Sequence, residues 1–109
     1  MPQKRELTEE EKAYKPIMEN PIRIDLKEWK SLFDIFGLLK RKLGLPDFCG
    51  ENWDAIWDLA KGFTDESVTI EFHGVSAVRE RFPEDVDIML EIFHDLHRGW
   101  PHIEYVVID

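Results

Sequence analysis

Two aspartates, Asp54 and Asp58, stand four residues apart in a short segment that also holds tryptophans and glycines. On a helix this spacing places both carboxylates on one face. Two acids in different environments can act as general acid and base, but that chemistry needs a cleft that shifts their pKa values, and one helix face supplies none. An exposed acidic face is better suited to binding a partner that offers arginine and lysine.

Metal binding and nucleophilic catalysis have weaker signals. His94 and His97 are three residues apart and His102 follows, but histidines in the last turn of a helix also complement its dipole. Cys49 has no base at a recognisable spacing, and one cysteine allows neither an internal disulfide nor a thiolate cluster. The chain has no phosphate-binding glycine loop, nucleophile elbow or zinc signature. We therefore expect a binding protein without catalytic residues, cofactor or metal.

The acidic segment has the signals of a short helix behind a loop. Asn52 is suited to cap the helix and Gly62 to end it. Trp53 is in register with Ile56 and Ala60 of the helix, which favours burial of its side chain. Trp57 lies between the acidic face and the apolar face, so partner contact and core burial both remain open.

The rest of the chain supplies the scaffold. Alternating residues and helical periodicity predict, in order, a strand over 22–26, a helix capped by Ser31 and ended by Gly44, a strand over 67–72, a short helix or turn over 75–81, a helix from Pro83 to Gly99 and a strand over 103–108. Helices between strands favour parallel pairing. The predicted fold is α/β, a small three-stranded parallel sheet covered mainly by helices.

Two details of the first helix are specific expectations. Its apolar stripe is predicted to comprise Leu32, Ile35, Phe36, Leu39 and Leu43. Gly37 interrupts the helix at a cost of up to about 1 kcal/mol relative to alanine, so we expect its missing side chain to permit close packing against a neighbour.

Length and charge restrict the classes of function. The 109 residues suit one domain, and the net charge of −9 disfavours direct contact with nucleic acid or an anionic membrane while it attracts basic proteins. We expect a polar, loosely attached extension over 1–20, with a possible helical turn capped by Thr8, and a folded domain over 21–109. The single cysteine and the absence of long apolar runs favour a cytoplasmic protein.

Around the acidic helix the chain reads Leu45-Pro46-x-x-x-Gly50-Glu51-Asn52-x-Asp54-Ala55-x-Trp57-Asp58. This pattern closely resembles the central motif of the barstar family of intracellular ribonuclease inhibitors. The resemblance continues more weakly over 22–109, through the order of strands and helices and the run Phe93-His94-Asp95. It implies a barstar-like fold.

The resemblance also implies a mechanism, in which the helix and its loop plug a ribonuclease active site and carboxylates replace RNA phosphates. Asp58 would then be the main phosphate mimic, and Asp54 would meet a second cationic cluster. Asp95 would add a peripheral charge. The remaining implied contacts are Phe48, Gly50, Asn52 and Trp57.

Three residues depart from the family pattern. Phe48 and Cys49 stand where the family has tyrosines, so Phe48 keeps a ring without its hydroxyl. Lys61 occupies a contact position that is threonine in the family and brings a positive charge toward a cationic site. Either Lys61 pairs with Asp58 three residues earlier, or the partner carries an acid opposite Lys61. The second alternative favours a different or diverged partner.

Three functional hypotheses follow. The first is an inhibitor that occludes the basic active site of a secreted or toxin-type ribonuclease. The second is a binding or immunity module of the same fold for a partner that is not a ribonuclease. The third is a hydrolase, which requires a pocket containing both Asp54 and Asp58, or a bound ion near His94 and His97.

Overall fold

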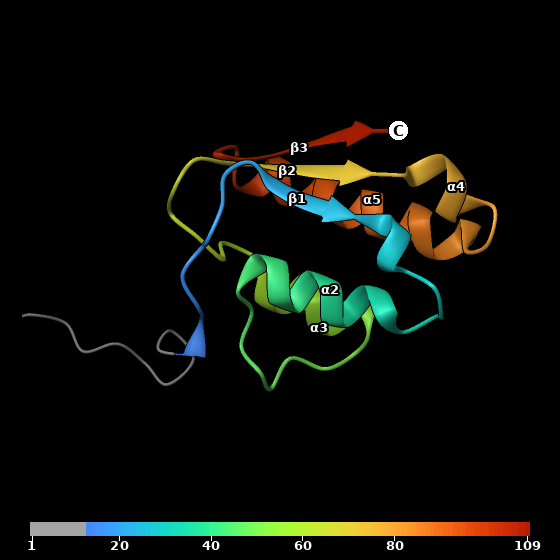
Figure 1. The fold of residues 1–109 in the computed structure, drawn as a ribbon. Helices are drawn as coiled ribbons and strands as arrows, with labels where there is room; N and C mark the ends of the chain where they lie inside the picture. Colours follow the sequence, from blue (N-terminus) through green and yellow to red (C-terminus); the bar gives the residue numbers. More distant parts are fainter. Residues whose placement is uncertain (1–12) are drawn as a thin grey trace, which may run out of the picture.

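A computed structural model of the protein describes residues 13–109 (Figure 1). The elements follow in the order β1 (Ile22–Asp25), the 3-10 helix η1 (Leu26–Glu28), α2 (Asp34–Leu43), α3 (Trp53–Ala60), β2 (Val68–His73), α4 (Val75–Arg79), α5 (Pro83–Gly99) and β3 (Ile103–Ile108). The predicted strands and helices are therefore present, with boundaries that differ by a few residues at some ends.

The three strands form one parallel sheet in the order β1-β2-β3. Ile70 at the centre of the sheet pairs with Ile22 on one side and with Tyr105 on the other. Because helices connect the strands, each strand re-enters the sheet in the same direction. This confirms the predicted three-stranded parallel α/β fold.

The helices gather on one side of the sheet (Figure 1). Side chains alternate between faces, and those of Ile24, Ile70 and Phe72 are fully buried on the helical side. On the other face Arg23 and Val106 are exposed. One face of the sheet therefore forms the core with the helices.

Aromatic rings join the parts of this core. Phe72 of β2 meets Phe93 of α5 edge-on with ring centroids 5.0 Å apart. Trp29, after η1, is fully buried and stacks on Phe82 at 5.2 Å. Among residues 13–109, no polar or charged residue belongs to the buried class. Charge is therefore carried by the surface, as the desolvation cost of unpaired ions requires.

The start of α2 differs from the prediction. Ser31 is not the N-cap: the helix begins at Asp34 and Phe33 is its N-cap. The Asp34 carboxylate accepts hydrogen bonds from the backbone N–H of Lys30 at 3.0 Å and of Ser31 at 2.7 Å, which folds the preceding residues into a turn and lowers the pKa of Asp34. Leu32 lies in this turn and is 44% exposed, so its place in the predicted apolar stripe was wrong.

Residues 13–20 are attached to the domain through several hydrogen bonds. The Tyr14 hydroxyl donates to the Leu59 oxygen at 2.6 Å, and the Lys15 N–H donates to the Gly44 oxygen at 2.8 Å. The Asn20 side chain donates to the Ser67 oxygen and accepts from the Thr69 N–H. The expectation of loose attachment was therefore wrong for this part of the extension. The turn predicted at Thr8 lies outside the described residues.

Gly37 does not lie at a packing contact, contrary to expectation. A Cβ built on Gly37 meets no atom within 4 Å, and the residue is exposed in the middle of α2. Nothing in the fold therefore requires glycine at this position. Gly44 is different, because its φ is +66° and an added Cβ would lie 2.5 Å from the Lys15 oxygen.

The Gly37→Ala substitution should raise the free energy of unfolding by roughly 0.5–1 kcal/mol, because alanine loses less backbone entropy in an exposed helix. Urea denaturation measures this change. Gly44→Ala, the matched control, should destabilise the fold through its left-handed backbone and the close oxygen. A Gly37→Ala protein that is less stable than the parent would contradict the open environment.

Candidate functional site

Helix α3 is capped at its start by a side chain and closed at its end by a glycine. Asn52 has an extended backbone, and its side-chain oxygen accepts from the Ala55 N–H at 2.8 Å. Gly62 has a φ of +60°, and a Cβ there would lie 2.9 Å from Nε1 of Trp100. The short helix that carries both aspartates therefore has defined ends.

The loop before α3 presents one large apolar side chain to solvent. Phe48 is 64% exposed, whereas its neighbour Cys49 is buried. Burial raises the pKa of the Cys49 thiol, which keeps it in the protonated, unreactive form. Gly50 is half-buried, and an added Cβ would lie 3.1 Å from the Asn52 side-chain nitrogen. The backbone therefore turns closely at Gly50 before the helix begins.

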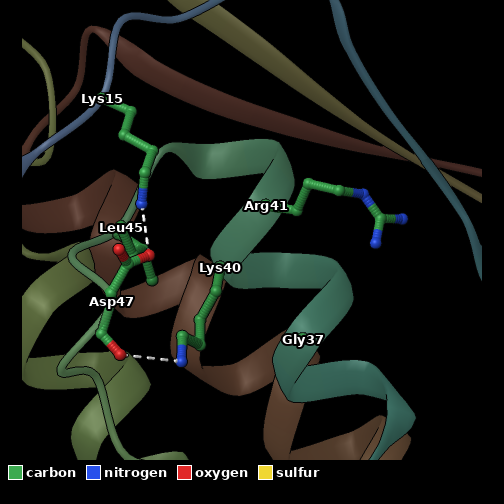
Figure 2. Close-up of a pocket in the computed structure, with 6 residues that line it drawn as sticks. All are labelled: Lys15, Gly37, Lys40, Arg41, Leu45 and Asp47. Carbon is green, nitrogen blue, oxygen red and sulfur yellow. Dashed lines mark hydrogen bonds and ion pairs between the residues drawn. The ribbon is translucent and has the colours of Figure 1, made fainter.

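Two lysines hold this loop at Asp47 (Figure 2). The Lys15 ammonium lies 2.5 Å from the Asp47 carboxylate, and Lys40 donates to the Asp47 backbone oxygen at 3.2 Å. The contact with Lys15 lowers the pKa of Asp47. These residues line a hollow of about 340 Å³ beside Gly37. Arg41 also lines it, but its guanidinium points away from Asp47 and pairs with Glu28 at 3.2 Å.

A groove of about 270 Å³ runs between α3 and α5. It is lined by Trp53, Asp54 and Trp57 from α3 and by Ile88, Glu91, Ile92 and Asp95 from α5. Helix α5 thus places Asp95 beside Asp54 and Trp57 of α3, from which it is far apart in the sequence. The groove combines apolar side chains with the carboxylates of Asp54, Glu91 and Asp95.

Three residues of this groove, Ile88, Glu91 and Ile92, were missed in the sequence. Ile88 is a large apolar residue exposed on α5, and Glu91 lies beside it on the same face. The signal was their helical spacing to Asp95, since positions three and four apart share a face. Apart from Asp95, which the family resemblance indicated, nothing in the sequence showed that this face of α5 lies beside the acidic helix.

Trp53 and Trp57 are both half-buried. Trp53 packs edge-on against Phe36 at 4.9 Å, and its Nε1 donates to the Asp85 carboxylate of α5 at 2.9 Å. Trp57 meets Trp100 edge-on at 6.5 Å and also lines the groove. Trp53 is thus anchored in the core, while Trp57 has one side in the core and one side at the surface.

Asp58 is 70% exposed in its side chain and is not among the residues that line the groove. The Lys61 ammonium lies 3.5 Å from the Asp58 carboxylate and 5.7 Å from the Trp57 ring centroid. The predicted pair between Lys61 and Asp58 is therefore present. Such an exposed pair contributes little to stability. Lys61 consequently keeps a positive charge beside the acidic helix.

The histidines make other contacts. His97 bonds the Ile103 backbone oxygen at 2.9 Å through Nδ1, and His94 lies 3.4 Å from the Tyr105 hydroxyl. Within residues 13–109, no three histidine, cysteine or acidic side chains are grouped so as to hold a metal ion. In the same range, no helix has the length and apolar character needed to cross a membrane.

Comparison with known proteins shows the family to which the chain is similar. The family model described as "Barstar (barnase inhibitor)" matches residues 19–107. A Bacillus subtilis (strain 168) protein named "Putative ribonuclease inhibitor YrdF" is 28% identical over 74 residues, which cover 68% of this chain and 81% of that protein. The family match spans every helix and nearly all of the strand residues described above.

The Asn52→Ala substitution should lower the free energy of unfolding by about 1 kcal/mol, because the Ala55 N–H loses its acceptor. Thermal and urea denaturation measure the loss. Asn52→Asp keeps a capping oxygen and should retain most of the stability. Equal stability of Asn52→Ala and the parent protein would contradict the capping role.

The Lys15 contact with Asp47 should make part of the stability pH-dependent. The folded pKa of Asp47 is below its ordinary value of 3.8, so this contribution is complete above that pH and is lost as the pH falls through the folded pKa. Lys15→Met should therefore destabilise the protein at pH 7, and the difference from the parent should shrink at acid pH.

The control for this comparison is Lys27→Met, which removes one positive charge from η1. Urea denaturation at several pH values measures all three proteins. A difference between Lys15→Met and the parent that stays constant below pH 3.8 would contradict the link to Asp47.

Proposed function

Because this chain belongs to the barstar family of barnase inhibitors, we propose that it binds a ribonuclease and covers the active site of that enzyme. The surface responsible is α3, the loop before it and the groove between α3 and α5. The protein then acts as an inhibitor without catalytic residues of its own.

The observation that carries this proposal is the joining of Asp54 and Asp95 around Trp57 in one groove. A ribonuclease active site binds RNA phosphates with cationic side chains, and carboxylates at matching positions can replace those phosphates. The apolar side chains of the groove add contact area that excludes water, which strengthens charge pairing. The net charge of −9 steers a basic enzyme toward this surface.

Each predicted site residue has a role in this proposal. Asp58, whose side chain is 70% exposed on α3, is the main phosphate mimic. Asp54 meets a second group of cations and Asp95 adds a charge from α5. Phe48, Gly50, Asn52 and Trp57 provide the surrounding contact. Phe48 suits this role because its ring is exposed in the free protein.

Lys61 pairs with Asp58 in the free protein, and we propose that it also marks a partner that has diverged from the enzymes that other family members inhibit. Its ammonium stays within 3.5 Å of Asp58, so it accompanies the phosphate mimic into the interface. A cationic active site would repel Lys61 unless an acidic side chain of the partner lies opposite it. We therefore propose a secreted or toxin-type ribonuclease with such an acid, inhibited in the cytoplasm.

A second function is an immunity or binding role toward a basic partner that is not a ribonuclease. Lys61 is again the observation that favours it, since one changed charge can exclude the family's usual target. The two functions differ in one outcome. A partner recovered from the source cell would have ribonuclease activity under the first and none under the second.

The Asp58→Asn substitution should weaken inhibition of the partner ribonuclease by at least about 30-fold, or about 2 kcal/mol, because a cation of the enzyme loses its charged acceptor. Titration of enzyme activity against inhibitor concentration measures the change. Glu80→Gln removes one charge from the exposed end of α4 and should leave inhibition unchanged within about twofold.

The same titration at rising salt concentration should show weaker inhibition by the parent protein, since salt screens the steering charge. The Asp58→Asn protein should lose less affinity over the same range. An inhibition constant for Asp58→Asn equal to that of the parent would remove Asp58 from the proposed role.

A further inference from the structure

We propose that the outer edge of β3 is a second interaction surface, through which two copies of this chain pair as antiparallel strands and extend the sheet. This surface is separate from the inhibitory one. The proposal goes beyond ribonuclease binding and does not depend on it.

The end of β3 is apolar and open. Val106, Val107 and Ile108 are 40%, 44% and 39% exposed. Consecutive strand residues point to opposite faces, so this exposure occurs on both faces at once. Parallel strands are ordinarily covered on both faces, which makes an uncovered apolar strand in a parallel sheet unusual.

The outer backbone of β3 is free to pair. On its inner side the Val68 N–H donates to the His102 oxygen at 3.0 Å and the Gly74 N–H donates to the Ile108 oxygen at 3.1 Å. Because the bonding direction alternates along a strand, the even-numbered residues of β3 face β2. The backbone groups of Tyr105 and Val107 therefore face outward, and no strand within residues 13–109 pairs with that edge.

This edge lacks the features by which proteins block strand pairing. From Tyr105 to Ile108 the strand has no charge, proline or glycine. The opposite edge of the sheet, β1, has only four residues, and two of them, Arg23 and Asp25, are charged. The sheet is thus protected on the β1 side and open on the β3 side.

A second copy of this chain matches this edge. An antiparallel register centred on Val106 places Val106 opposite its own copy, and Tyr105 opposite Val107 of the second copy, with main-chain hydrogen bonds in both directions. The same register places Glu104 opposite Ile108 of the second copy, so the acidic side chains do not meet. The strand is therefore self-complementary in backbone, charge and side-chain character.

The pairing leaves the α3 part of the inhibitory surface accessible. In Figure 1, β3 lies at the opposite side of the molecule from α2 and α3. A dimer through β3 can therefore bind two enzyme molecules, one on each α3 surface. Because one strand edge buries little area, the association is expected to be weak and to depend on protein concentration.

Analytical ultracentrifugation between about 10 µM and 1 mM tests this proposal, and the parent protein should shift from monomer to dimer across that range. Val107→Pro removes an outward N–H and keeps the ladder to β2, so it should stay folded and monomeric. Val106→Lys, on the open face, should also be monomeric. Both variants should inhibit the ribonuclease as the parent does.

Cysteine cross-linking tests the register. In the proposed pairing Val106 and its copy form a non-hydrogen-bonded pair about 4.5 Å apart, within disulfide range, so Val106→Cys should form a covalent dimer on oxidation. Glu104→Cys is the matched control, since its two copies would lie about 13 Å apart. A parent protein that is monomeric at all concentrations, or a dimer that persists in both Val107→Pro and Val106→Lys, would overturn the proposal.

Discussion

The indole of Trp53 in α3 contacts α2, α5 and Trp29, the residue that follows η1. Its ring packs edge-on against Phe36 of α2 at 4.9 Å and against Trp29 at 6.4 Å. Its Nε1 donates to the Asp85 carboxylate near the start of α5 at 2.9 Å. An indole nitrogen that loses its partner on burial destabilises the fold, so this hydrogen bond and the ring contacts constrain α3 together.

The orientation of α3 decides which side chains reach solvent. With Trp53 turned inward, the helical spacing directs Asp54 and Asp58 outward and leaves Trp57 at the boundary. The same inward position of Trp53 brings α3 beside α5 and so forms the groove that contains Asp95. The loop that leads into α3 is held at Asp47 by Lys15 and Lys40. The proposed inhibitory surface is therefore a consequence of core packing as well as of charge.

Much of the fold follows from local sequence signals. The alternation of Val68, Ile70 and Phe72 predicted a strand with one buried face, and all three are buried. Asn52 predicted a capped helix because one residue supplies the acceptor for the N–H three positions later. Such features depend on neighbours within one or two turns of chain, which is why sequence reasoning found them.

The features that were missed depend on contacts between distant segments. Leu32 fits a helical stripe, but the Asp34 carboxylate folds that residue into a turn. Tyr14 reaches Leu59 across 45 positions. The groove forms only where the face of α5 that carries Glu91 lies beside α3. No signal within either helix predicts that contact. Sequence spacing therefore identified the acidic helix but gave only part of the surface around it.

We propose that one surface, made of the loop before α3, α3 itself and the facing side of α5, covers the ribonuclease active site. Amide chemical-shift mapping by NMR, with the ribonuclease added to the labelled protein, tests this most directly. We expect the largest changes at Phe48, Asn52, Asp58 and Asp95 and their neighbours, with the strands unaffected. Changes confined to the sheet, or none while the enzyme is fully inhibited, would contradict it.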